Sequence, residues 1–265
     1  ILNPDTVLGE NVLKDVIDFL EKTPKAGAVG VKMIDGSGAF LRESKRSFPS
    51  PWVSFCKICG LTKLFPRSSI FGKYHLYYLH EDATHEVDVL AGAFIMIKKE
   101  VLNKVGLLDE DFFMYGEDID FSYRIVLAGY KNYYLPFPII HYKGESTKQD
   151  MRYVKVFYEA MYIFFKKYYP HYGKLYSGII TFGIAIRGFI AATKRFFTNK
   201  QQVKTKKLPN YILFNRENMT YEDMIKEMDR STKKTNQYLI YSPKSNMTVG
   251  SQSFFEGKEN HASRE

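Results

Sequence analysis

The stretch FFMYGEDIDFSYR runs from Phe112 to Arg124 and places three acids, Glu117, Asp118 and Asp120, behind an aromatic run and a glycine. The acids open a helix-like pattern that ends at Gly129. A carboxylate pair behind large apolar side chains suits a general base in a partly dry pocket. The structural alternative is that the acids of this first turn are there because the helix dipole favours them. This stretch alone leaves both interpretations open.

The composition is that of a folded protein with one large or two small domains. The chain has 265 residues, of which 45% are hydrophobic and 16% aromatic, so a disordered chain is excluded. Two cysteines provide no disulfide framework, which is consistent with a reducing compartment. The chain begins at Ile1, without a methionine, in what reads as the end of a strand. We therefore expect a fragment that lacks its N-terminal part.

The N-terminal region has an α/β pattern. A strand end breaks into a turn at Pro4, a helix is predicted over Asn11–Thr23, and an apolar strand over Ala26–Ile34. The turn sequence DGSG, from Asp35 to Gly38, closes that strand. Asp5 lies where open α/β sheets place ligand groups, and one carboxylate with substrate phosphates can hold Mg²⁺ or Mn²⁺. The alternative is an Asx-turn aspartate that bonds only its own backbone.

The middle of the chain is less regular. We interpret Leu41–His85 as a long mobile excursion that can cover an acceptor site. Its lone CxxC, Cys56 to Cys59, has no second ligand pair, so we interpret both as ordinary thiols.

Two strands and two helices are predicted beyond the excursion. Glu86–Lys98 reads as a strand in which Ala91-Gly92-Ala93 indicates a close approach to the backbone or a bulge. A short helix over Lys99–Val105 and the acidic helix to Leu127 follow. The prolines in Tyr133–His141 predict an edge strand or an irregular strand.

A family resemblance joins these segments. The motifs LNPDT, VDVLAGAFIMI, VGLLDEDFFMYGEDIDFSYRI, AGYK and IIHYKGEST occur in an order that resembles family 2 glycosyltransferases, in the rhamnosyltransferase-like branch that builds bacterial surface polysaccharides. The resemblance covers Ile1 to Lys148. It implies a GT-A fold, a Rossmann-like α/β domain that is partial here because the family's nucleotide-binding strand and helix lie upstream of these motifs.

The resemblance also implies roles for individual residues. Asp118 matches the family's catalytic base, with Glu117 beside it. Asp5 matches the last acid of the metal-binding motif, which holds a divalent ion on the donor diphosphate, and His141 matches a histidine that completes the metal shell in some members. The positions expected to border substrates are Asp88, Gly92, Ala93, Tyr115, Gly116 and Lys143.

The positive charge lies in one segment. Ala160 to Arg216 contains 11 Lys and Arg and no acid, whereas the rest of the chain carries 27 Lys and Arg against 29 Asp and Glu. The segment 149–207 predicts an aromatic helix over Asp150–Tyr169 and an apolar stretch over Leu175–Thr193. Arg187 makes the apolar stretch a poor membrane span, so we expect helices on an anionic membrane surface. The cations expected to face lipid are Lys166, Lys167, Lys194, Arg195, Lys200, Lys204, Lys206 and Lys207.

Two alternatives accompany the membrane interpretation. The apolar stretch can instead be a buried helix packed on the catalytic domain. Nucleic acid fits the charge, but no motif in the chain supports it, so no nucleic-acid partner is expected. The remainder, 208–265, reads as a separate extension with strands over Asn210–Phe214 and Tyr238–Tyr241, a helix from Thr220 to Asp229, and a frayed end of about fifteen residues.

Together these observations predict an inverting, metal-dependent glycosyltransferase at the cytoplasmic face of the inner membrane. The donor is expected to be a UDP- or dTDP-sugar, and the acceptor a lipid-linked saccharide or an oligosaccharide. The alternative is a non-catalytic membrane-surface binding module that keeps the acceptor half of the fold without the donor half.

Overall fold

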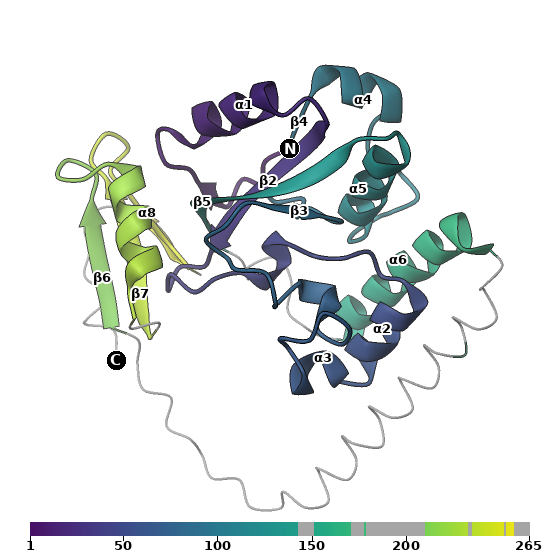
Figure 1. The fold of residues 1–265 in the computed structure, drawn as a ribbon. Coiled ribbons are helices and arrows are strands. Elements are labelled where there is room, and N and C mark those ends of the chain that lie inside the picture. Colours follow the sequence, from purple (N-terminus) through teal and green to yellow (C-terminus); the bar gives the residue numbers. More distant parts are fainter. Residues whose placement is uncertain (143–150, 171–177, 179–209, 233–234, 252, 257–265) are drawn as a thin grey trace, which may run out of the picture.

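The structure is a computed structural model that describes residues 1–142, 151–170, 178, 210–232, 235–251 and 253–256. A mixed α/β sheet with its helices adjoins a smaller four-stranded sheet (Figure 1). The α/β class predicted from the sequence is confirmed.

Two parallel strands form the centre of the main sheet, β2 (Ala26–Ile34) and β5 (Lys131–His141). Three short strands pair antiparallel with this centre: β1 (Thr6–Val7) and β3 (His85–Val87) lie along β5, and β4 (Met96–Ile97) lies along β2. Every residue of β2 is buried, as in a strand that is covered on both faces.

Helices cover both faces of this sheet. On one face, α1 (Val12–Lys22) packs on alternate residues of β2 such as Val29. On the other face, α4 (Lys99–Val105) and α5 (Glu117–Leu127) share a core with Ala28. All three helices were predicted from the sequence. The alternation of β2 side chains between two apolar cores explains why the strand tolerates almost no polar residue.

The predicted strand over Glu86–Lys98 is two strands, and this correction matters for the site. The chain leaves β3, crosses to the other side of the central pair, and turns where Phe94 N donates to Ala91 O at 3.1 Å, before it enters β4. The small residues Ala91-Gly92-Ala93 make this turn. The close approach that they indicated is confirmed, because Gly92 N lies 3.2 Å from Asp118 Oδ2.

The predicted edge position of Tyr133–His141 is wrong, whereas its predicted irregularity is confirmed. β5 is central, with β2 on one side and β3 and β1 on the other. Its register against β2 shifts between Leu135 and Pro138, so Pro136 falls in a bulge where its missing N–H breaks no ladder bond.

The excursion contains more regular structure than expected. It forms a 3₁₀ turn at Arg42–Ser44, then α2 (Pro51–Ile58), α3 (Leu61–Leu64) and a second 3₁₀ turn at Lys73–His75. Ser50 caps α2 by accepting a hydrogen bond from Val53 N, and a proline occupies the first helical position, which favours helix initiation. The two cysteines of the CxxC sequence are free thiols.

The predicted aromatic helix is α6 (Met151–Tyr168), which packs against α5 through Ala160, Met161 and Phe164. The prediction that Lys167 faces lipid is wrong. Its Nζ atom pairs with Asp109 and, at 2.8 Å, with Asp120, because the buried carboxylate of Asp120 requires a partner. Asp109 and Asp120 therefore join the start of α5 to the end of α6 through this lysine. The stretch Leu175–Thr193 and the cations from Lys194 to Lys207 lie outside the described residues.

No helix among the described residues is long and apolar enough to cross a membrane.

The C-terminal part forms the second sheet. It contains the predicted strands β6 (Asn210–Asn215) and β7 (Asn236–Ser242) and the predicted helix α8 (Tyr221–Arg230), which is capped by Thr220. A hairpin that was not predicted, β8 (Met247–Gly250) with β9 (Ser253–Glu256), completes the sheet. Part of the tail expected to be frayed is therefore a strand.

This C-terminal sheet packs directly on the main sheet. Ile34, Ile140 and Tyr142 share a buried apolar cluster with residues of α8 and β7. The carboxylate of Glu10 accepts hydrogen bonds from Tyr221 N and Glu222 N, so an acid of the main domain caps α8. The C-terminal part is thus no detached extension.

Candidate active site

The acid pair begins a helix that follows a strained turn. Tyr115 has φ of 67° and Gly116 has φ of 89°, both in the left-handed region. A Cβ atom at Gly116 would lie 2.9 Å from Phe112 Cδ1 and 3.1 Å from Ala160 Cβ. Only glycine fits this backbone and this space without displacing its neighbours. The turn therefore fixes where α5 begins and brings Glu117 and Asp118 to the N-terminus of that helix.

Asp118 is held by two donors from distant segments. Its Oδ2 atom accepts hydrogen bonds from Arg46 Nη2 and from Gly92 N. Arg46 also donates to Leu90 O at 3.0 Å, and the side chains of Arg46 and Asp118 are 12% and 15% exposed. The ion pair is thus largely shielded from water, and it holds the carboxylate in one orientation.

Glu117 has the opposite environment. Its Oε2 atom is buried and has no hydrogen-bond partner among the described residues. Burial, and secondarily the charge of Asp118, raise the pKa of Glu117. Two adjacent carboxylates therefore differ, since within the described part of the chain one is paired with a cation and the other is not.

Gly92 lies close to both acids. A Cβ atom at Gly92 would lie 3.6 Å from Asp118 Cβ and 3.9 Å from Glu117 Oε1, in ordinary van der Waals contact with both acids. A larger side chain at this position would occupy the space next to both carboxylates.

Asp5 and His141 come together through strand pairing. β1 runs antiparallel to β5 with Thr6 opposite His141, and Tyr142 N donates to Asp5 O at 2.9 Å. This register places His141 Nε2 3.2 Å from Asp5 Oδ1. The aspartate side chain is 41% exposed and the histidine side chain is 9% exposed. A largely buried imidazole therefore lies beside an accessible carboxylate.

This pair fits one side of a divalent ion site. Carboxylate oxygen and imidazole nitrogen are ligands that Mn²⁺ accepts, and Mg²⁺ accepts the oxygen. Among the described residues, no cluster of three or more His, Cys, Asp or Glu side chains could hold a metal ion. A divalent ion here would take its remaining ligands from a diphosphate and from water.

A short piece of backbone connects the two ends of the site. Asn3 N donates to Ala93 O at 3.0 Å, while Gly92 N donates to Asp118. The turn at Ala91-Gly92-Ala93 therefore contacts the acid on one side and the segment leading to Asp5 on the other.

The remaining predicted substrate residues have different surroundings. Asp88 Oδ2 accepts a hydrogen bond from Phe48 N at the base of the excursion, and Ala93 is buried in the core beneath α1. Tyr115 and Gly116 form the strained turn described above. Lys143 lies outside the described residues. Contact of these residues with substrate stays a prediction.

Sequence reasoning missed Arg46. It is one of several basic residues in an excursion without an obvious period, and nothing local marks it as the partner of an acid. Lys57, Tyr74 and His75 lie near Arg46. Lys57 Nζ lies 3.4 Å from the Tyr74 ring centroid, and the Tyr74 ring packs edge-on against the His75 ring. Burial, with the charges of Lys57 and Arg46, lowers the pKa of His75 to about 3, so its imidazole is neutral at physiological pH.

The amino-acid sequence is similar to those of known proteins. Residues 1–187 match the family Glycosyl transferase family group 2. N-acetylglucosaminyl-diphospho-decaprenol L-rhamnosyltransferase of Mycobacterium tuberculosis is 29% identical over 166 residues, 62% of this chain and 53% of that protein. Rhamnosyltransferase WbbL of Escherichia coli strain K12 is 32% identical over 151 residues, 56% of this chain and 53% of that protein.

A hexosyltransferase of low-salt glycan biosynthesis from Haloferax volcanii is 27% identical over 124 residues, 47% of this chain and 35% of that protein. The chain spans about half the length, or less, of the curated relatives it matches. The family match nevertheless includes every site residue named above, and it covers more than half of the chain. This protein belongs to glycosyl transferase family group 2.

Proposed function

We propose that this chain carries the acceptor side of an inverting, metal-dependent glycosyltransferase, which moves a sugar from a UDP- or dTDP-sugar to a lipid-linked saccharide in bacterial surface-polysaccharide synthesis. The observation that supports this most is the joint placement of an acid pair and an Asp–His pair at the two sides of one short turn. The names of the relatives, which include a diphospho-decaprenol rhamnosyltransferase, support the class of acceptor.

In the proposed reaction, Asp118 accepts the proton of an acceptor hydroxyl. The resulting nucleophilic oxygen forms a bond to the anomeric carbon of the donor as the bond from that carbon to the diphosphate oxygen breaks. The electron pair of the broken bond leaves with the nucleoside diphosphate. Attack opposite the leaving group inverts the anomeric centre, and a general base of this kind typically contributes about 10²–10⁴-fold in rate.

The protein groups divide this task between them. Arg46 and Gly92 N orient Asp118, and the missing side chain of Gly92 leaves space for the acceptor hydroxyl. Asp5 and His141 would hold the divalent ion, which neutralises charge on the leaving diphosphate when it is bound. Burial and the charge of Asp118 raise the pKa of Glu117, which favours a neutral carboxyl group beside the proposed base.

The proposed location is the cytoplasmic face of the inner membrane, with peripheral attachment. The support comes from the basic composition of 149–207 and from a lipid-linked acceptor, whose sugar lies at a bilayer surface.

The test is calorimetric titration of UDP and of dTDP, with and without Mn²⁺. Binding that requires Mn²⁺ and is lost in Asp5→Asn and in His141→Gln is the expected result. Asp111→Asn is the matched control, because that acid is exposed and lies outside the site. Metal-independent binding, or binding that survives both substitutions, would overturn the metal site.

An assay of sugar transfer distinguishes the non-catalytic alternative from the proposed function. The alternative predicts no sugar transfer by the native chain, whatever the titration shows.

A further inference from the structure

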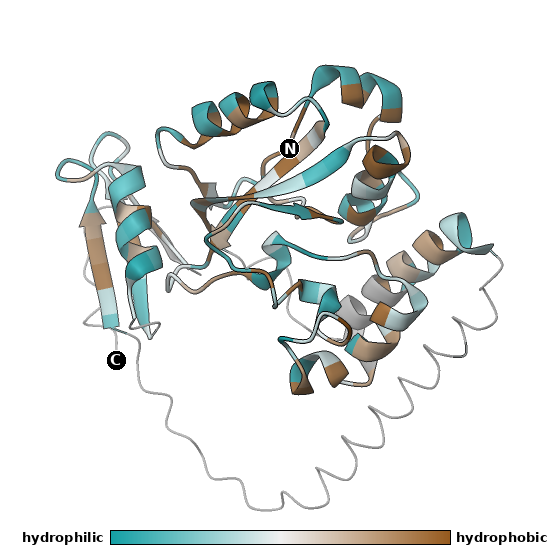
Figure 2. Ribbon diagram, in the orientation of Figure 1, coloured by the Kyte–Doolittle hydropathy of each residue, from teal (hydrophilic) through white to brown (hydrophobic). Residues whose placement is uncertain are grey.

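The outer part of the excursion exposes a continuous apolar surface that the proposed site does not use. Four large side chains on or next to α2 and α3 are strongly exposed: Trp52 at 48%, Leu64 at 70%, Phe65 at 52% and Ile70 at 58%. Figure 2 shows apolar colour on α3, at the margin of the molecule away from the main sheet. Exposure of four neighbouring large apolar residues is costly unless a partner covers them.

Aromatic contacts join these residues into one patch. Trp52 lies 5.7 Å from Phe55 and 6.1 Å from Phe71, measured between ring centroids. Phe71 lies 5.4 Å from Phe65. The rings therefore form a continuous line, with Leu64 and Ile70 beside it in the chain. A supported row of rings is a preformed surface rather than a set of isolated exposed residues.

The charge of this region has one sign. Residues 44–80 contain six Lys and Arg and no Asp or Glu. Three of these cations interact with groups inside the protein. Lys45 is buried, Arg46 pairs with Asp118, and Lys57 lies over the Tyr74 ring. The other three, Lys63, Arg67 and Lys73, are exposed beside the apolar residues, and the described part of the chain offers them no ion pair.

We propose that this surface, the α2–α3 patch, docks on an anionic lipid bilayer. The patch consists of Trp52, Lys63, Leu64, Phe65, Arg67, Ile70 and Lys73. Tryptophan and phenylalanine beside lysine and arginine form the composition that binds in the headgroup region, where rings enter the apolar boundary and cations meet anionic headgroups. A protein partner would need an acidic apolar surface, such as the exposed Leu107, Leu108, Phe113 and Met114 beside Asp109 to Asp111 in a second copy, and the experiment below distinguishes that partner from a bilayer.

The patch belongs to the same excursion as the contacts around the acid pair. Arg46 pairs with Asp118 and forms a β-bridge with Val89, and Phe48 N binds Asp88, so the excursion is anchored at the site by its first residues. Docking through the patch would set the height of the acids above the bilayer. This consequence for a lipid-linked acceptor rests on the proposed function, whereas the docking itself does not.

The chain contains a single tryptophan, and it lies in the patch. Trp52 emission therefore reports on this surface alone. We expect a shift to shorter wavelength when the whole chain meets vesicles of phosphatidylglycerol and phosphatidylcholine, and quenching by lipids brominated near the headgroups. Vesicles of phosphatidylcholine alone should bind far more weakly.

Two charge variants give the matched comparison. The triple substitution Lys63→Gln, Arg67→Gln and Lys73→Gln should weaken binding by about a hundredfold, since three cations are lost at a surface where each contributes roughly a factor of five. The triple substitution Lys14→Gln, Lys22→Gln and Lys99→Gln removes the same charge from exposed positions on α1 and α4 and should have little effect. Leu64→Ser with Phe65→Ser tests the apolar component.

Three results would overturn the proposal. The first is vesicle binding without any change in Trp52 emission, which would place the contact elsewhere in the chain. The second is emission that depends on protein concentration without vesicles, which would make a second copy of this chain the partner. The third is no vesicle binding at all. Sugar transfer to a soluble acceptor, measured separately, reports on the proposed function without involving the patch.

Discussion

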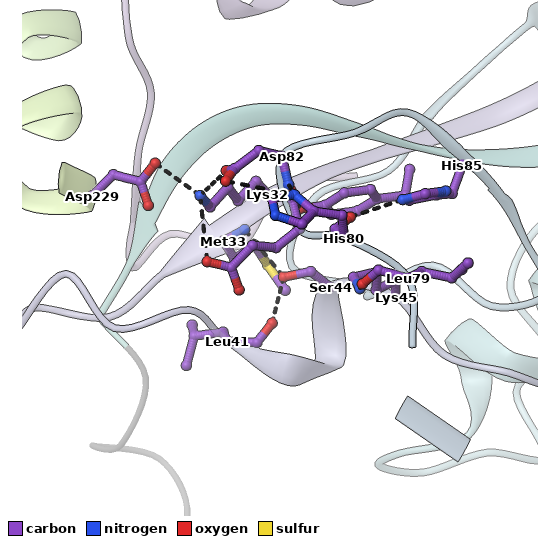
Figure 3. Close-up of polar contacts among 12 residues, drawn as sticks. Lys32, Met33, Leu41, Ser44, Lys45, Leu79, His80, Asp82, His85 and Asp229 are labelled. Atoms are coloured by element: carbon purple, nitrogen blue, oxygen red, sulfur yellow. Dashed lines mark hydrogen bonds and ion pairs between the residues drawn. The ribbon is translucent and has the colours of Figure 1, made fainter. Parts of the chain in front are cut away.

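Two buried cations connect distant parts of this chain, and they differ in what surrounds them. Arg46 in the excursion pairs with one acid, Asp118. Lys32 in β2 donates to two acids, Asp82 and Asp229, with a third, Glu81, at 3.9 Å, and its side chain is only 3% exposed (Figure 3). Burial by itself lowers the pKa of Lys32, but its hydrogen bonds to Asp229 and Asp82 outweigh this and raise the pKa.

This difference distinguishes the region around Lys32, which stabilises the fold, from the region around Arg46, which we propose takes part in the reaction. Lys32 joins β2 to two distant segments, since Asp82 lies near the end of the excursion and Asp229 belongs to α8. Among the described residues, Arg46 forms an ion pair with Asp118 alone, whose carboxylate lies next to Gly92. Lys32 thus holds acids from distant segments at an interface, whereas Arg46 orients the single carboxylate that we propose as the base. Four substitutions, in three experiments, test this comparison.

The largest effect is expected for Asp118→Asn. The amide keeps the shape and can still contact Arg46, but it cannot accept a proton from an acceptor hydroxyl. We expect the initial rate of sugar transfer to fall by about 10²–10⁴-fold. Transfer rates of Asp118→Asn and of the exposed control Asp111→Asn, with donor binding measured in parallel, check this. Transfer retained by Asp118→Asn would show that another group is the base.

The next effect compares Lys32→Met with Arg46→Met. Removing one partner of a buried ion pair costs about 3–5 kcal/mol, and the lower value applies to Lys32 because the Asp82 side chain is 57% exposed. We expect the free energy of unfolding to fall for both variants in denaturant titrations.

Sugar transfer distinguishes the two substitutions. The folded fraction of Lys32→Met should transfer sugar at the native rate, whereas Arg46→Met should be slower because Asp118 loses its orienting partner. Equal transfer rates per folded molecule would remove the distinction between the two regions.

The smallest effect concerns Glu117→Gln. The raised pKa of Glu117 means that the folded state binds this proton more tightly than the unfolded state does. Stability is therefore greatest at low pH and declines as pH rises through the folded pKa. Glutamine resembles the protonated form, so the variant should be more stable than the native chain at pH 8 by about 1 kcal/mol, the lower end of the penalty for an unsatisfied buried polar group.

Thermal unfolding of both proteins at pH 8 and pH 4 measures this effect. The gain should vanish at the lower pH, where the native Glu117 is protonated. A gain that is equal at both values would mean that the glutamine acts through packing and not through charge.

Local chemistry explains the elements that sequence reasoning found. The DGSG turn forms because Asp35 Oδ1 accepts hydrogen bonds from Ser37 N and Ala39 N, and α5 ends before Gly129 because that residue has φ of 89°. Thr220 caps α8 as its side chain predicted. These signals act within about four residues, so the sequence contains them completely.

Longer-range features were missed or misplaced for a common reason. The Glu86–Lys98 stretch has one apolar pattern, but its halves pair with different strands. The β8–β9 hairpin has little local signal, and β7 pairing positions it. Strand partners depend on the whole sheet, so the residues of a short strand do not specify them.

The candidate site divides in the same way. The motifs and the family resemblance identify Glu117, Asp118, Asp5 and His141 from the sequence alone. That Asp5 and His141 lie 3.2 Å apart depends on the register of β1 against β5. That Asp118 has a cation depends on Arg46, which is 72 residues away in the sequence.

The amino-acid sequence alone determined the helices outside the excursion, the DGSG turn, the family and the acids with which chemistry can be done. The tertiary structure decided which acid is paired with a cation and which has a buried oxygen without a hydrogen-bond partner among the described residues, and it joined the C-terminal sheet to the core through Lys32 and Asp229, 197 residues apart. The physical reason is the distance along the chain over which each interaction acts. Helix and turn preferences arise between near neighbours in the chain, whereas burial and Coulomb interactions depend on neighbours in space, which exist only after the chain has folded.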